Sequence, residues 1–110
     1  MKFYESERIV GVANSTVYGN GLTSTEAEVK RINRVWIITS ARQGNFAEFW
    51  IENERIANIH DDILPLNNES FRIEFPIDVE LPIGKTLKPA LRCGGTATNI
   101  TVIYEYEIVR

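Results

Sequence analysis

The stretch from residue 34 to residue 60 reads RVWIITSARQGNFAEFWIENERIANIH and predicts three β-strands in succession. Apolar side chains recur at every second position, and β-branched and aromatic residues dominate, as they do in strands. Turn formers at residues 43–45 separate strands over 34–42 and 46–52. A tight loop is expected at residues 53–54, before a third strand over 55–60, so the stretch predicts antiparallel hairpins.

The second half of the chain continues this two-residue period. Alternation over 71–75 and 77–81 predicts two further strands, and the loop DDILPLNNE precedes them at residues 61–69. Strands are also expected over 86–93 and 99–110, the latter reading NITVIYEYEIVR, with Val102, Tyr104, Tyr106 and Ile108 filling the core.

Two prolines bear on the position of these strands, because proline cannot donate a hydrogen bond to a neighbouring strand. Pro76 predicts that the strand over 71–75 ends there or lies at a sheet edge. Pro89 predicts an edge strand or a bulge within 86–93.

The first quarter of the chain is less regular. Strand character is found over 9–12 and 15–18. Residues 25–30 fit a strand, which we favour, but Thr23 and Glu26 also fit the capping box of a short helix. About eight short strands and no long helix predict a single domain over residues 1–110, an all-β antiparallel β-sandwich.

Composition excludes several classes of protein. A net charge of −3 argues against nucleic acid as a main partner, and the one basic cluster, Lys30, Arg31 and Arg34, is expected on a solvated face. No run approaches the roughly 20 apolar residues of a membrane span. Without an apolar N-terminal run, no signal peptide is expected, so folding in a cytosol is predicted.

Candidate chemical groups are few. Cys93 is the single cysteine and is expected to be a buried thiol. His60, Asp61 and Asp62, with the nearby loop to Glu69, offer oxygen ligands of the kind that calcium uses, but their spacing fits no EF-hand. We expect an unliganded loop there, with a metal as the alternative.

No arrangement typical of an enzyme is found. A lone His60 without a matching serine or cysteine motif does not make a catalytic dyad. Paired carboxylates can hydrolyse sugars, but Glu74, Asp78 and Glu80 alternate with core residues and are expected on outward faces. We therefore expect no catalytic residues, no metal and no cofactor.

Apolar side chains occupy the second face of several strands, although a sandwich strand needs only one apolar face. Soluble monomers rarely expose a large apolar patch, so a subunit interface in a homo-oligomer is predicted. An alternative is that Trp36, Phe46 and Trp50 form a platform on which sugars stack. The residues expected at the oligomer interface are Trp36, Ile38, Phe46, Trp50, Ile103 and Val109.

Two segments, VWIITSARQGNFAEFWIENERIANIH and FPIDVELPIGKTLKPALRCGGTATNITVIYEYEIV, resemble small structural proteins of phages and archaeal viruses. The shared texture is a GNF-containing hairpin, a PIDVELP strand and turn, and a closing strand beginning TATN. Asn53-Glu54 stands where Asn-Gly is expected in that type, and the turn is Ile83-Gly84-Lys85. The resemblance covers about the last three quarters of the chain.

The resemblance implies a jelly-roll-like sandwich, commonly a homotrimer, that decorates or cements a capsid or belongs to a spike or tail. Its implied partners are copies of itself and capsid or tail proteins, in a virion assembled in the host cytoplasm. Residues 1–22 match least, and an arm to a neighbouring subunit is one role for them. The competing functions are a carbohydrate-binding or receptor-binding module and a small hydrolase that uses His60.

Overall fold

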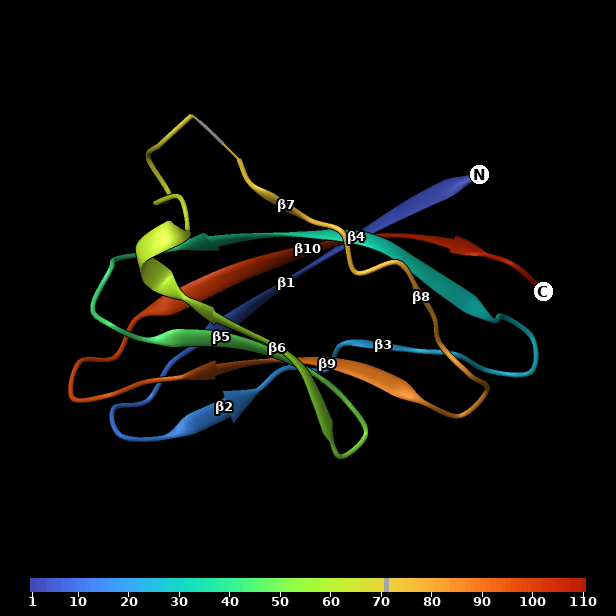
Figure 1. Cartoon of the computed structure of the whole chain (residues 1–110), viewed down its shortest axis with the longest axis horizontal. Helices are drawn as coiled ribbons and strands as arrows, with labels where there is room; N and C mark the ends of the chain where they lie inside the picture. Colours follow the sequence, from blue (N-terminus) through green and yellow to red (C-terminus); the bar gives the residue numbers. More distant parts are fainter. Residues whose placement is uncertain (71) are drawn as a thin grey trace.

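Two antiparallel sheets pack face to face in the computed structural model, which describes residues 1–70 and 72–110 (Figure 1). Within these residues there is no α-helix, and one 3-10 turn, η1 (Asp61–Ile63), lies at the end of the sandwich opposite the two chain termini. The predicted all-β antiparallel sandwich is confirmed.

Each sheet has four strand positions, and in each sheet one edge position is occupied by two short strands. Sheet A runs in the order β1 (Lys2–Val10), β10 (Asn99–Ile108), β4 (Lys30–Thr39), and then β7 (Glu74–Phe75) and β8 (Val79–Glu80). Sheet B begins with β2 (Thr16–Tyr18) and β3 (Leu22–Thr23) and continues with β9 (Thr86–Arg92), β5 (Phe46–Ile51) and β6 (Glu54–His60). The first strand pairs with the last, and the ten strands found in the described residues occupy eight positions in the order of a jelly roll.

The break between β7 and β8 faces an irregularity in β4. Between Arg34 and Ile32 the register of β4 against β10 shifts, which leaves Asn33 as an extra residue in β4. Asp78 meets this bulge with a positive φ of 45°, and its N–H donates to the Asn33 carbonyl at 3.2 Å. Pro76 cannot donate a backbone hydrogen bond to β4. On this edge, the strands predicted over 71–75 and 77–81 are each only two residues long, as β7 and β8. Phe71 of the predicted strand lies outside the described residues.

The edge position, one of the two alternatives expected for Pro89, is wrong, because β9 lies inside sheet B, between β5 and the broken edge. The edge strand is interrupted over residues 19–21, which face Pro89 in the gap between the Tyr18–Ala90 and Leu22–Leu87 pairs. The Gly19 N–H donates to the Pro89 carbonyl at 2.8 Å. The edge strand therefore bends away from β9 at the position where Pro89 has no N–H to donate. The break between β2 and β3 accommodates this proline.

The core lies between the sheets and is made by the inward faces that alternation predicts. Val35, Ile37, Phe49 and Tyr104 are almost completely buried. Ile108 is not in the core as expected, since it is 37% exposed where β10 ends.

Residues 25–28 form neither the favoured strand nor the alternative helix. The Thr25 N–H donates to the Glu28 carbonyl at 2.9 Å, and the Glu28 N–H donates to the Thr25 carbonyl and hydroxyl, each at 3.2 Å. These local bonds close a turn, and β4 begins only at Lys30.

The N-terminal segment extends sheet A of its own chain. β1 pairs with β10 from Lys2 opposite Glu107 to Val10 opposite Asn99. Glu7, on the inward side of β1, accepts hydrogen bonds from the backbone N–H groups of Asn20 and Gly21 at the edge of sheet B. This carboxylate ties the edges of the two sheets together. An arm reaching a neighbouring subunit stays a prediction.

Candidate functional site

The outer face of sheet B carries a buried carboxylate. Glu48 projects outward from β5 and yet is only 3% exposed. Its oxygens accept hydrogen bonds from Trp50 Nε1 at 3.1 Å, Arg55 Nη1 at 3.0 Å and Arg92 Nε at 3.0 Å. Three strands contribute these groups, because β5 lies between β6 and β9. We call Glu48, Trp50, Arg55 and Arg92 the Glu48 network.

The Glu48 network keeps this carboxylate charged. Burial alone raises the pKa of Glu48, but the hydrogen bonds from Trp50, Arg92 and Arg55 outweigh it and bring the pKa below the ordinary value of 4.5. The sequence places Glu48 on the outward face, and only the register of the three strands shows that it is covered.

Phe46 supports one side of the Glu48 network. The Arg92 guanidinium carbon lies 4.4 Å from the centroid of the Phe46 ring, a cation–π arrangement. The His60 ring meets Phe46 edge to face at a centroid distance of 4.9 Å. Phe46, an expected interface residue, is thus partly covered by its own chain.

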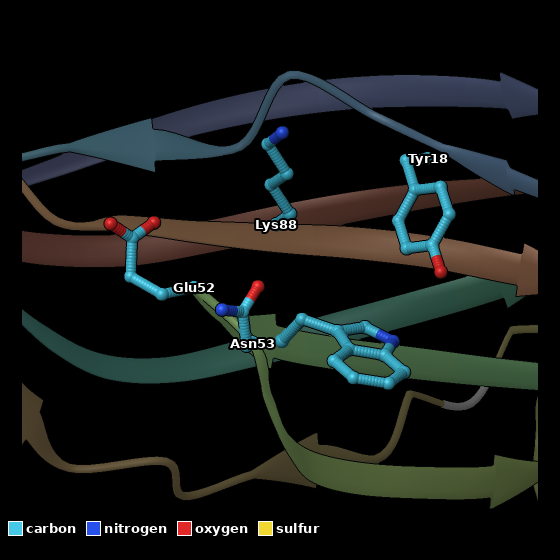
Figure 2. A pocket seen from close by; sticks show the side chains of 5 residues that line it. Tyr18, Glu52, Asn53 and Lys88 are labelled. Carbon is cyan, nitrogen blue, oxygen red and sulfur yellow. The ribbon is translucent and has the colours of Figure 1, made fainter.

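An open pocket of about 280 Å³ lies beside the Glu48 network. Figure 2 shows Lys88 rising between Tyr18 on one side and Glu52 on the other, with Asn53 at the β5–β6 hairpin. Trp50 also lines the pocket and meets Tyr18 edge to face at 6.3 Å between centroids. We call it the Tyr18–Trp50 pocket.

Of the pocket residues, only Trp50 was singled out from the sequence as a candidate binding residue. The others come from β2, β9 and the hairpin, and nothing in their local sequence distinguishes them. The strand order of sheet B brings them together.

The outer face of sheet A is apolar at its centre. Trp36 and Ile103 are directly paired across β4 and β10, and Ile38 pairs with Thr101 one step along. The Tyr4 ring, which is 62% exposed on β1, lies 6.4 Å from the Trp36 ring. We call Tyr4, Trp36, Ile38 and Ile103 the sheet A cluster.

Charged groups next to the sheet A cluster are paired with one another. Glu105, only 4% exposed, meets Lys2 Nζ at 3.0 Å and Arg34 Nε at 3.6 Å. Arg34 also reaches Glu74 on β7 at 2.9 Å. The cluster is therefore bordered by ion pairs that need no further partner.

The six residues expected at an oligomer interface lie in three places. Trp36, Ile38 and Ile103 gather on sheet A, whereas Phe46 and Trp50 lie on sheet B, on the opposite side of the sandwich. Val109 lies beyond the end of β10, where its N–H donates to the Val29 carbonyl at 2.8 Å.

Asp61 in the expected loop supports the chain around it. Its carboxylate is 2% exposed and accepts hydrogen bonds from the backbone N–H groups of Gln43, Gly44 and Asn45 at 2.9, 3.2 and 3.1 Å. His60 Nδ1 accepts from the Asp62 N–H at 3.1 Å. One possible metal-binding atom from each of residues 60–62 lies within 4.8 Å of the others. In the structure, however, Asp61 and His60 use their side chains to hydrogen-bond the backbone of the turns around them.

The remaining charged candidates occupy separate ion pairs on sheet A. Arg31 pairs with Asp78, Arg34 with Glu74, and Arg110 with Glu80. Lys30 pairs with Glu28 at 3.5 Å and also donates to the Thr23 carbonyl at 2.7 Å. Its side chain is nearly buried, contrary to the expected solvated face.

The expected burial of the Cys93 thiol is confirmed.

In the part of the chain that the structure describes, no helix has the length and apolar character needed to cross a membrane. No protein-family model, curated protein or solved structure matches this chain. A functional proposal must therefore rest on the residues that the outer faces of the two sheets present.

Proposed function

We propose that this chain is a non-enzymatic virion structural protein, a homo-oligomeric subunit that decorates or cements a capsid or belongs to an appendage. The sheet A cluster is the observation that carries the proposal, and the resemblance to small viral structural proteins supports it. Jelly rolls are common in viral capsid domains, which agrees with the proposal but leaves other functions open.

The sheet A cluster has the composition of a subunit interface. Interface cores are enriched in aromatic residues and depleted of charge, and a polar rim surrounds them. Here Trp36 and Ile103 form the centre, and Glu105, Arg34 and Lys2 pair beside them. Because these charges are already neutralised, a second copy can cover the apolar centre without leaving a buried charge unpaired.

Light scattering at micromolar concentration tests the oligomer. The expected result for the chain is three times its mass of 12.5 kDa. A double variant, Trp36→Ser with Ile103→Thr, keeps residues that strands accept and should weaken association at least tenfold. Ile56→Thr, an exposed apolar position on sheet B, is the matched control and should leave the mass unchanged. A monomeric wild-type chain would contradict the proposal.

Gene neighbourhood tests the viral part separately. A major capsid protein gene beside this one is the expected result. A neighbourhood of metabolic genes would contradict a virion role while leaving the oligomer intact.

A further inference from the structure

We propose that the Tyr18–Trp50 pocket binds a saccharide, with one pyranose ring packed against the exposed face of the Trp50 indole. The pocket lies on the outer face of sheet B, whereas the proposed oligomer interface lies on sheet A. The two proposals therefore rest on different residues, and one can fail without the other.

Trp50 is held in place before any ligand arrives. Its indole Nε1 is bound to Glu48, and the Tyr18 ring lies against it edge to face. The ring nevertheless stays partly exposed and lines the pocket. A fixed aromatic surface loses little conformational entropy on binding, which favours stacking of the C–H face of a sugar ring.

The Glu48 network accounts for the position of Trp50. A carboxylate buried on the solvent side of a sheet carries a desolvation penalty, which only well-placed donors offset. Glu48 has three such donors, and the two arginines hold it where Trp50 Nε1 can reach. The indole orientation is therefore set by a charge-assisted contact and not by loose surface packing.

Among the described residues, two polar side chains in the pocket are unpaired and a third makes only one long ion pair, so all three can bind hydroxyl groups. Within the described residues, Lys88 and Asn53 make no side-chain hydrogen bond or ion pair, and Glu52 has one long contact of 3.8 Å with Lys85. An ammonium donates, a carboxylate accepts, and an amide does both. Sugar hydroxyls match this mixed set, whereas an apolar peptide would leave it unpaired and a phosphate would face the Glu52 carboxylate.

The hairpin at the pocket has unusual backbone geometry. Glu52 has a positive φ of 52°, which is uncommon for a residue other than glycine. Tight hairpins between twisted strands require such a conformation, and Asn-Gly normally provides it. Here residues with polar side chains stand in the turn, and Glu52 and Asn53 both line the pocket.

Fluorescence gives a direct test because the chain has two tryptophans, one on each sheet. In a Trp36→Phe variant, all tryptophan emission comes from Trp50. Titration with neutral hexoses, N-acetylated hexose oligomers and sugars bearing a carboxylate should produce a saturable change with at least one class. Trp50→Phe, which reports Trp36 alone, should show no change.

Variants of the polar groups define the ligand further. Lys88→Ala and Asn53→Ala should weaken binding at least tenfold, whereas Ile56→Thr, outside the pocket, should not. A loss confined to acidic sugars in Lys88→Ala would assign the ammonium to a sugar carboxylate. Glu48→Gln substitutes no residue that lines the pocket and tests whether Glu48 positions Trp50. It should weaken binding and lower the fluorescence anisotropy of Trp50.

Saturation-transfer NMR on the unaltered chain repeats the test without any substitution. If no sugar class binds at millimolar concentration by either method, the proposal is wrong. It is also overturned if sugars bind and Lys88→Ala, Asn53→Ala and Trp50→Phe all keep the wild-type affinity, because the site is then elsewhere.

Discussion

Trp50 Nε1 donates a 3.1 Å hydrogen bond to Glu48, two residues earlier on the same outward face of β5. This contact joins an aromatic surface to a buried charge, and Arg55 and Arg92 complete it from the neighbouring strands. Sheet B thus presents an ordered polar layer to its surroundings. Sheet A presents an apolar centre instead, so the two faces of the sandwich suit different partners.

The Glu48 network should make stability depend on acidic pH. The Glu48 pKa is lowered in the folded chain, so its contribution is complete above the ordinary pKa of 4.5 and is lost as pH falls through the folded value. At pH 7, Glu48→Gln should reduce the free energy of unfolding by about 1–2 kcal/mol. Urea unfolding at several pH values should show this difference shrinking below the ordinary pKa; a difference independent of pH would contradict it.

Asp61 should be far more important for stability than its neighbour Asp62. Removing the carboxylate in Asp61→Ala leaves three backbone N–H groups without their acceptor, at a cost of about 2–4 kcal/mol. Asp62→Ala is the matched control and should change stability by less than about 0.5 kcal/mol. Thermal melting with and without calcium measures both effects. If calcium stabilised the chain markedly, Asp61 would have a ligand role as well.

Gly21 and Gly44 both have positive φ values, 72° and 77°, but they differ in surroundings. A Cβ added at Gly21 would lie 1.8 Å from the Leu87 carbonyl oxygen, whereas nothing lies within 4 Å of one added at Gly44. Gly44→Ala should therefore lose only about 1 kcal/mol from backbone strain. Gly21→Ala should lose about 3 kcal/mol or more, because the strand must move. Similar denaturation midpoints for the two variants would contradict this.

Tyr104 should tolerate the loss of its hydroxyl. The side chain is buried between the sheets, and its hydroxyl has no hydrogen-bond partner among the described residues. Burial raises the Tyr104 pKa, and the nearby Glu7 charge raises it further. Tyr104→Phe should leave stability unchanged or increase it by up to about 1 kcal/mol in urea unfolding. A clear loss of stability would reveal a buried partner for the hydroxyl.

Much of the fold follows from local pattern. Alternation over residues 46–52 assigns Ala47 and Phe49 to the core and Trp50 to the outer face, and the structure agrees. The pattern is less reliable where strands break. Pro89 looked like an edge marker, yet it sits inside sheet B because the chain opposite it bends away.

The candidate sites could be predicted only in part. Trp36 and Ile103 were expected on second faces, and their direct pairing agrees with a shared surface. Phe46 also lies on a second face, as expected, but the strand order places it on the other sheet from Trp36 and Ile103, and Arg92 covers it. No local pattern tells which of two sheets a strand will join.

The two-residue period of the strands, and hence the set of side chains that enter the core, can be read from the chain alone, because a strand turns alternate residues to opposite faces. Which outward residues come into contact depends on how the strands are ordered in the folded chain. Tyr18, Trp50 and Lys88 lie on three strands of sheet B, and only the order β2, β9, β5 makes them one pocket. Long-range pairing sets that order, since the cross-strand neighbours of a residue are far from it in the chain.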